Sequence, residues 1–416
     1  MDDAAPRLRN DTDFRWPEQG LQVIPDWIYT SEEILNRERE RIFKGHVWNF
    51  VGLEAEIPKA GDFKRSHIGD IGVIVSRAED GSIHVFENRC AHRGAEICRR
   101  HNGSNAEFVC PYHQWTYGLD GSLKAVPFRR GVGKKGGMPG DFKMEEHGLT
   151  RLSVTTHRGV IFASYASDME SIPEYLGAEV LKDFEATFDG RKLKILGYYR
   201  NLIPGNWKMY HENLKDPYHA TLLHSYLVVF NLMVAGQKST MTVDPTGRHG
   251  SMGSAKGDQV DETDTSQMRA YRSDMRLRDP RIVDFVKEFD SPWSVTMLTI
   301  WPNMIVQREL NTLGTRQIVP RGPNEFELNW TMFGYEGDDE AMTRHRLRQG
   351  NLMGPSGFLG LEDNEASKFV QDGLRHSTPE HGTLALGGTE EGTTQHLITE
   401  AAIRSMYRHY RGVMEL

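Results

Sequence analysis

The spacing of apolar residues divides the chain into stretches of different character. Residues 1–29 are interrupted by proline and tryptophan, and this pattern predicts an arm. Thr30 followed by Glu33 fits a capping box, and the apolar positions after it predict a helix that runs to about Phe43. The chain therefore opens with an arm and one helix.

From Val47 to about Ser164 the pattern changes to short apolar segments separated by turn residues. Two such segments, 71–77 and 82–88, are joined across Glu79-Asp80-Gly81, and a second Asp-Gly turn stands at Asp120-Gly121. Asp-Gly between apolar runs is typical of β-hairpins. This part predicts a small all-β domain.

The rest of the chain combines segments with helical spacing of apolar residues and segments in which apolar and polar residues alternate as in strands. It predicts a helix over 172–188, a strand over 193–203 and a further helix that begins near 204–206. Residues 236–292 are rich in Gly, Asp and Ser and predict loops or a lid. Strand patterns then return, and helical patterns close the chain: strands at 294–300, 304–310, 315–320 and 326–335, and helices at 338–353, 358–372 and 394–413. The second half is thus α+β, a sheet with helices packed on it.

Composition and charge narrow the class of protein. A chain of 416 residues exceeds what one hydrophobic core usually supports, so at least two domains are expected. The formal net charge is −8 without a run of like charges, which disfavours nucleic acid and anionic membranes as partners. The N-terminus has no apolar signal region, and the longest apolar stretch, 226–235, is too short to cross a bilayer. We therefore expect a cytoplasmic protein.

Two short motifs in the β-rich stretch each combine one cysteine with one histidine, at 90–94 and 110–115. Two thiolates on one iron and two imidazoles on the other are the ligand set of a Rieske 2Fe–2S cluster. Zinc is the alternative, because tetrahedral Cys and His sets also suit that metal. Zinc fingers, however, pair Cys with Cys and His with His, so the mixed spacing favours the cluster. Cys98 lies outside both motifs and is interpreted as a small buried thiol.

A second candidate metal site lies in the segment 205–224. Two histidines and a distant carboxylate make the facial triad of mononuclear Fe(II) enzymes. His219 and His224 are five residues apart, about 140° around an ideal helix, so both can reach one metal only if the helix is distorted or ends between them. Pro217 makes such a break plausible. A buried helix that carries histidines without a metal remains the alternative.

With both motifs the sequence resembles the Rieske non-haem iron oxygenases over nearly its whole length. The resemblance implies the cluster ligands Cys90, His92, Cys110 and His113, with Trp115 shielding the cluster. The pattern Glu-Asn-x-x-Asp-x-x-His-x₄-His is similar to the iron motif of the family, and a late helix after Gly354-Pro355-Ser356-Gly357 supplies the third ligand. The implied iron ligands are His219, His224 and Asp363, with Glu362 as a lesser candidate for the last.

The resemblance also implies an architecture and an assembly. The expected domains are an N-terminal arm and helix (1–44), an all-β Rieske domain (45–165) and an antiparallel sheet-and-helix catalytic domain of START-like or Bet v1-like fold (166–416). Asp216 is expected to bridge His219 and His113 of a neighbouring subunit, and Asn213 to support the iron site. Such a bridge requires a ring, most simply a homotrimer, α3 or α3β3 with a small beta subunit.

The implied reaction is oxygenation of an aromatic ring by O2, with electrons from NAD(P)H delivered by a reductase with or without a ferredoxin. Within the family the chain is most similar to the branch that acts on terephthalate, salicylate, anthranilate and halobenzoates. Arg316 is a candidate clamp for a substrate carboxylate, and Tyr226 and Phe230 are candidate pocket walls. Residues 395–398 lack the second arginine of terephthalate enzymes.

We therefore expect dioxygenation of a small aromatic monocarboxylate. Monohydroxylation of salicylate and dioxygenation of terephthalate are alternatives within the same family. A pure electron carrier and a structural zinc protein are the alternatives from other classes.

Overall fold

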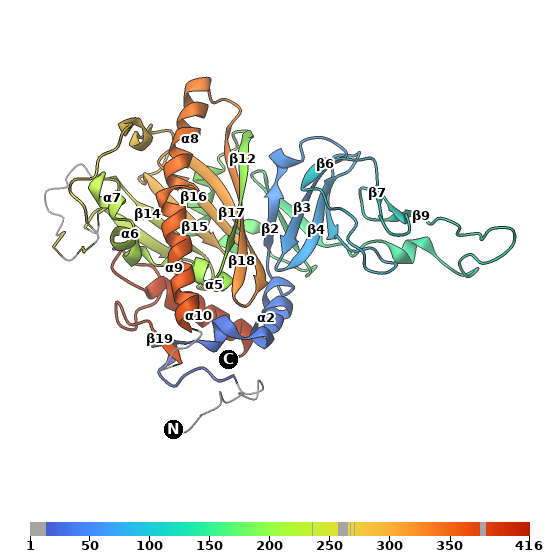
Figure 1. Ribbon diagram of the computed structural model, residues 1–416, viewed down its shortest axis with the longest axis horizontal. Coiled ribbons are helices and arrows are strands. Elements are labelled where there is room, and N and C mark those ends of the chain that lie inside the picture. The colour runs from blue at the N-terminus through green and yellow to red at the C-terminus, as the bar shows by residue number, and fades with distance from the viewer. Residues whose placement is uncertain (1–13, 235, 257–264, 267, 270, 375–379) are drawn as a thin grey trace.

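The computed structural model describes residues 14–234, 236–256, 265–266, 268–269, 271–374 and 380–416. The molecule is elongated: a β-rich part built from the first third of the chain projects from one side of a larger sheet-and-helix part (Figure 1). The first residues of the expected N-terminal arm, 1–13, lie outside the described residues. Among the described helices, none is long and apolar enough to cross a bilayer.

The β-rich part contains three small antiparallel sheets. They are, in spatial order, β5 (Ile83–Glu87), β4 (Ile71–Arg77), β3 (Asp62–Ile68) and β6 (Asn102–Ser104); β7 (Phe108–Val109), β8 (Thr116–Tyr117) and β9 (Leu123–Ala125); and β10 (Ser153–His157), β11 (Val160–Ser164) and β2 (Asn49–Leu53). Both predicted hairpins are present, because β4 pairs with β5 and β8 with β9. The Asp-Gly turns therefore identified this part correctly.

The larger part is built on one seven-stranded antiparallel sheet. Its strands, in spatial order, are β12 (Leu193–Ile203), β18 (Glu325–Tyr335), β17 (Thr312–Gly322), β16 (Met304–Glu309), β15 (Val295–Ile300), β14 (Gly250–Ser254) and β13 (Ser239–Val243). Strands β12 and β15 to β18 were predicted from their apolar patterns. The prediction of loops or a lid over 236–292 was wrong at β13 and β14, which extend the sheet there. Their small residues, Gly, Ser and Thr, masked the strand pattern.

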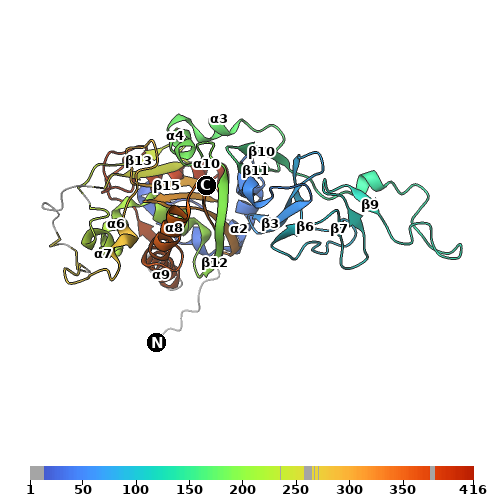
Figure 2. The ribbon, with the colours of Figure 1, turned by 90° about the horizontal axis from the view of Figure 1, so that it is seen from above.

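Helices cover both faces of this sheet. Figure 2 places α8 (Glu340–Met353) and α9 (Phe358–Leu374) on one face and α3 (Ile172–Leu176) and α4 (Ala178–Thr187) on the other. The single helix predicted over 172–188 is divided at Gly177, whose φ of 72° ends α3. The last helix, α10 (Ala401–Met414), begins later than predicted.

The N-terminal helices pack against α10 at the base of the molecule (Figure 1). The capping residue is Ser31 rather than Thr30: the Ser31 side chain accepts from the Ile34 amide, while Thr30 ends α1 (Trp27–Thr30). Helix α2 (Glu32–Glu38) continues as one wider turn to Phe43. Glu38, fully buried, forms an ion pair at 2.7 Å with the equally buried Lys208 of the larger part. A sheet of β1 (Val23–Pro25) and β19 (His381–Thr383) adds a second attachment.

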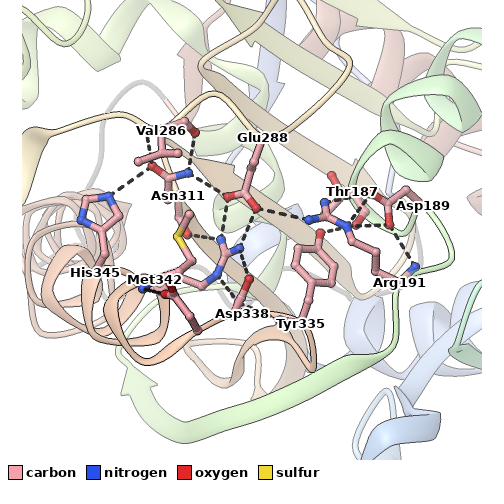
Figure 3. A network of polar contacts seen from close by, with 12 residues as sticks. Thr187, Asp189, Arg191, Val286, Glu288, Asn311, Tyr335, Asp338, Met342 and His345 are labelled. Carbon is pink, nitrogen blue, oxygen red and sulfur yellow. Dashed lines mark hydrogen bonds and ion pairs between the residues drawn. The ribbon is translucent and has the colours of Figure 1, made fainter.

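A polar network fixes α8 to the sheet (Figure 3). Arg346, buried in α8, forms ion pairs with Glu288 at 2.6 Å and with Asp338 at 2.7 Å. Glu288 also accepts from the side-chain amide of Asn311, which leads the chain into β17. A bidentate guanidinium between two carboxylates is a strong and directional contact. This network anchors the segment around Glu288 over the end of the sheet.

The two parts meet at β2. Its residues belong to the same hydrophobic core as the large sheet, whereas the loops near β7 and β8 have a separate small core. Asn303 accepts from the Phe50 amide at 2.9 Å and donates to its carbonyl at 3.1 Å, and Gln317 donates to the same carbonyl at 2.8 Å. The β-rich part is therefore docked on the sheet through backbone contacts.

Candidate metal centres and active-site cavity

Two loops of the same backbone geometry meet in the β-rich part. In the first, the Cys90 amide donates to Ala95 and the Gly94 amide returns to the Cys90 carbonyl, each at 2.9 Å. In the second, the Cys110 amide donates to Trp115 at 2.9 Å and the Gln114 amide returns to Cys110 at 3.0 Å. Gly94 and Gln114 both have positive φ, 71° and 58°. The repeated pattern presents one Cys and one His from each loop toward the other.

The donor atoms of these loops suit a cluster. The cysteines are buried, and the rings of His92 and His113 lie 4.6 Å apart. The buried Nδ1 of His92 has no partner among the described residues and is therefore free to bind a metal. Trp115 stacks on His92 at 4.9 Å with nearly parallel planes, which places it where the resemblance implied a shield. Two thiols and two imidazoles at one tip fit a Rieske cluster.

One residue of this site escaped the sequence analysis. The Tyr117 hydroxyl lies 3.2 Å from Cys90 Sγ and accepts from the Ala91 amide at 3.1 Å. Hydrogen bonds to cluster ligands are among the factors that set reduction potentials. Nothing in the sequence distinguishes Tyr117 from an ordinary core tyrosine, because its role depends on the fold of the two loops. Cys98 is buried, as expected.

The second site lies where a helix is broken. Helix α5 (Trp207–Lys215) begins at Asn206, whose side chain caps it, and ends at Asp216. Asp216 then caps α6 (Pro217–Leu223), accepting from the amides of Tyr218 and His219. His224 stands at the junction between α6 and α7 (Ser225–Val229), outside regular helical geometry. On an unbroken helix the two histidines would point about 140° apart. Because α6 ends before His224, the His224 side chain no longer follows that rotation and can approach His219.

Helix α9 supplies the carboxylate. Asp363 Oδ1 lies 3.0 Å from His224 Nε2 and 3.5 Å from His219 Nε2, and the candidate ligand atoms of the three residues all lie within 4.8 Å of one another. His224 and Asp363 are almost completely buried. The structure thus brings together the three residues that the sequence analysis proposed as iron ligands.

The second nitrogen of each imidazole is held by the protein. His219 Nδ1 donates to the backbone carbonyl of Asp216 at 2.5 Å, and His224 Nδ1 donates to Glu362 at 2.7 Å. A proton fixed on Nδ1 leaves Nε2 as the metal-binding atom, and both Nε2 atoms point to Asp363. Glu362 therefore serves to orient His224 rather than to act as the alternative ligand. Asn213 Nδ2 adds hydrogen bonds to Asp363 at 3.1 Å and to His219 at 3.3 Å.

The electrostatics also fit a dication. Burial opposes charge on all three side chains, but hydrogen bonds from His219 and His224 hold the pKa of Asp363 far below its usual range. Burial likewise lowers the pKa of His219, yet Asp216 and Asp363 more than compensate and raise it to about 10. Without a metal, the imidazoles of His219 and His224 are therefore more easily protonated than free histidines. Two imidazoles and one carboxylate are the set expected for non-haem Fe(II), and Fe(II) would replace the Nε2 protons.

A cavity opens beside these residues. Its walls come from α5, α6, the segment 227–233, strands β14 to β16, and the start of α9, and they are mostly apolar. The apolar lining residues are Leu214, Ala220, Leu227, Leu232, Met233, Met252, Val295, Met297, Leu310, Met353 and Leu359. A mostly apolar lining with a few polar groups is typical of a pocket for a small organic ligand.

The expected substrate-binding residues lie elsewhere. Arg316 is fully buried beneath α5, where it donates to the Tyr210 hydroxyl and stacks 4.0 Å from Trp330, and it does not line the cavity. Tyr226 packs on Phe358, and neither it nor Phe230 is a lining residue. The expected wall is instead formed by Leu227, Leu232 and Met233 of the same segment. Leu227 lies in α7 and Leu232 and Met233 follow it, whereas Tyr226 is buried on the side of Phe358.

One polar lining residue was missed, Glu309 on β16. Gln307 and Glu309 stand two apart in a strand pattern and so share a face of the sheet, which is the only signal that the sequence offers.

Comparisons with known proteins agree with this geometry. Residues 47–135 match the Rieske [2Fe-2S] domain, and residues 181–416 match the ring hydroxylating alpha subunit (catalytic domain). The chain is 46% identical to the large oxygenase component of salicylate 5-hydroxylase from Ralstonia sp., over 97% of this chain and 96% of that protein. It is 39% identical to the anthranilate 1,2-dioxygenase large subunit of Burkholderia cepacia, over 97% and 96%.

It is also 37% identical to the alpha 2 subunit of the terminal oxygenase component of terephthalate 1,2-dioxygenase from Comamonas sp., over 96% and 97%. Among solved structures, naphthalene 1,2-dioxygenase from Rhodococcus sp. superposes with a TM-score of 0.78 at 23% identity, covering 95% of this chain and 96% of that one. The structural likeness establishes the fold, an α+β arrangement of a Rieske domain and a larger antiparallel sheet-and-helix domain.

Proposed function

Because this chain belongs to the family of ring-hydroxylating oxygenase alpha subunits, we propose that it hydroxylates a small aromatic monocarboxylate that carries an amino or hydroxyl group. The family membership makes it an oxygenase component with one Rieske cluster and one mononuclear iron, supplied with electrons by partner proteins. Salicylate and anthranilate, named in two of its relatives, are the candidate substrates.

The observation that carries the proposal is the cavity beside the His219, His224 and Asp363 cluster. We assign these three residues to the mononuclear iron, and Cys90, His92, Cys110 and His113 to the Rieske cluster. When bound, Fe(II) on two imidazoles and one carboxylate keeps open positions at which dioxygen is activated. The apolar walls exclude water and hold an aromatic ring beside the site.

The surrounding residues position the ligands. Asn213 fixes Asp363 and His219, while Glu362 and the Asp216 carbonyl fix the rings of His224 and His219. Arg316 has a guanidinium whose Nε and Nη2 have no partner among the described residues, but α5 separates it from the cavity. As a carboxylate clamp it remains a prediction that requires Tyr210 to move.

Two oxygenation outcomes belong to this proposal. Dioxygenation was expected from the sequence, and monohydroxylation is supported by the 46% identity to salicylate 5-hydroxylase. The test is product analysis under labelled O2 with salicylate, anthranilate, benzoate and terephthalate, using the oxygenase with its reductase. Hydroxylation of salicylate or anthranilate supports the proposal, and one or two labelled atoms in the product decide between the outcomes. Turnover of terephthalate alone would contradict it.

We also propose that the catalytic unit is a ring of subunits. Within one chain the loops next to β7 and the iron helix α6 lie at opposite ends of the molecule (Figure 1). Tyr112 at the loop tip is 58% exposed, and Tyr218 and Leu222, close to Asp216, are also exposed. A neighbouring tip docked there, most simply in a homotrimer with or without a beta subunit, would place His113 beside Asp216. The domain boundaries at 44–45 and 165–166 remain predictions of the same kind.

A further inference from the structure

The cavity contains one polar side chain that the proposed iron site does not use. Apart from the three proposed ligands and their neighbours Asn213 and Asp216, all lining side chains are apolar except Glu309. Glu309 is 3% exposed, so its carboxyl has lost nearly all contact with bulk water. A buried carboxyl is costly unless hydrogen bonds satisfy it. Its place in an apolar cavity therefore needs an explanation.

The register of the sheet explains why Glu309 reaches the cavity and Arg316 does not. Cross-strand partners share a face of the sheet. Glu309 pairs with Val295 on one side and with Thr312 on the other, and Arg316 pairs with Ile305. Because Ile305 and Glu309 are four residues apart on β16, Arg316 and Glu309 lie on the same face. Helix α5 covers the Arg316 end of this face through Tyr210. It leaves the Glu309 end open to the cavity, next to Val295.

Glu309 is held in a fixed orientation by its neighbour. Gln307 Nε2 donates to Glu309 Oε2 at 2.9 Å and to the Met353 carbonyl at 2.8 Å. Among the described residues, Gln307 is the one hydrogen-bond donor to Glu309. An ionised carboxylate accepts several hydrogen bonds, so Oε1 retains acceptor capacity.

The surroundings of Glu309 act on its carboxyl in both directions. Burial raises the pKa of Glu309 and Asp363 acts in the same direction, while the Gln307 hydrogen bond and the charge of Arg316 oppose part of the rise. A ligand N–H or O–H aimed at Oε1 would complete the solvation of the carboxylate. No other lining side chain outside the iron site offers this interaction.

We propose that Glu309 determines substrate specificity by accepting a hydrogen bond from a hydroxyl or amino group on the aromatic ring. This inference rests on the proposed function. It names the group on the substrate, a ring hydroxyl or amino group, that the same cavity recognises. The cavity then favours hydroxybenzoates and aminobenzoates over benzoate, because benzoate leaves the acceptor unpaired. A site built around a buried polar group rejects ligands that lack its partner far more strongly than an apolar pocket rejects a changed shape.

The experiment compares Glu309→Leu and Glu309→Gln with the wild type. Binding of salicylate, anthranilate and benzoate to the oxidised holoenzyme is measured by calorimetry without reductase, so that no turnover occurs, and kcat/KM is measured separately. Glu309→Leu should weaken salicylate or anthranilate binding by about ten- to hundredfold and leave benzoate unchanged or improved. Glu309→Gln retains an acceptor oxygen and should preserve most of the selectivity.

A matched control is Met252→Leu, which alters an apolar wall residue on β14, two strands away from Glu309 on β16. It should change the binding of all three acids by similar factors. If Glu309→Leu also weakens all three acids equally, Glu309 only supports Gln307 and the inference is overturned. If the wild type binds and hydroxylates the acids but Glu309→Leu leaves their ratio unaltered, the inference fails while the proposed function stands. A wild type that neither binds nor hydroxylates any of the three contradicts both.

Discussion

Lys215 shows how far burial alone changes the chemistry of a residue. It ends α5 fully buried, donates to Thr299 Oγ1 at 2.7 Å, and forms no ion pair among the described residues. Burial lowers the pKa of Lys215 to about 7, against a smaller opposing effect of Asp244. The unfolded chain, with its ordinary lysine pKa, therefore binds the proton more tightly than the folded protein between about pH 7 and pH 10.5.

This difference predicts a pH dependence of stability. The contribution of Lys215 should rise with pH in that window by up to about 1.4 kcal/mol per pH unit, because the unfolded state holds more protons. Lys215→Met should raise the apparent unfolding temperature at pH 7, with an advantage that shrinks toward pH 9. Thermal melts of the holoenzyme at several pH values measure it. Lys194→Met, which removes an exposed lysine, is the control, and a constant difference at all pH values would contradict the prediction.

At the same scale, His219 tests the division between the two metal sites. His219→Ala removes a proposed iron ligand at the end of the molecule opposite the cluster loops. We expect hydroxylation to be lost and the iron content to fall, while the visible absorbance and reducibility of the cluster persist. Loss of the cluster signal in a folded variant would mean that the two sites are not independent.

At the scale of elements, the turn between α8 and α9 sets the position of Asp363. The Gly354-Pro355-Ser356-Gly357 segment folds back so tightly that a Cβ on Gly357 would lie 2.1 Å from the Leu352 carbonyl oxygen. A Cβ on Gly360 would lie 2.8 Å from the Gly354 carbonyl oxygen. Both glycines therefore allow backbone contacts that no other residue permits, and α9 begins at a defined place because of them.

Gly357→Ala should accordingly displace the start of α9. Its Cβ meets backbone, which cannot move aside cheaply, so Asp363 should move away from His219 and His224. The expected result is a loss of bound iron and of hydroxylation, with the cluster retained. Iron analysis and cluster absorbance measure both sites in the same sample. Gly373→Ala in the same helix meets nothing within 4 Å and should keep its iron, and equal iron content in the two variants would count against this account.

At the scale of the whole molecule, the docking of β2 fixes the cluster loops far from the iron site of their own chain. The hydrogen bonds of Asn303 and Gln317 to the Phe50 backbone hold β2 against the large sheet. This arrangement motivates the proposed contact between the loop tip of a neighbouring subunit and Asp216. Its carboxylate caps α6, while its carbonyl holds His219.

The ring can be tested by complementation. A Cys110→Ala variant, defective at the cluster loops, and a His219→Ala variant, defective at the iron site, should each be inactive alone. When they are co-expressed, mixed rings pair an intact tip with an intact iron site on the neighbour, and part of the activity should return. Asp216→Asn in the His219-intact partner should abolish that recovery. No recovery in mixed rings that are shown to form would contradict the cross-subunit arrangement.

The sequence by itself predicted the cluster and much of the fold, because ligand spacing, Asp-Gly turns and alternating strands are local properties, whereas the iron ligands were predicted with the help of the family resemblance. Cys90, His92, Cys110, His113, His219 and His224 stand in short motifs, and the strands of the large sheet that carry apolar patterns were recognisable. The small residues of β13 and β14 carried no such signal.

Only the tertiary structure decided what surrounds the metal sites. Arg316 and Glu309 share one sheet face, yet α5 covers the first and leaves the second open to the cavity. Glu362 became the partner of His224 and Asp363 the residue between the two imidazoles, although they are neighbours on one helix. Such assignments depend on which helix packs over which strand. That choice is made by contacts between residues far apart in the chain, and no local pattern records it.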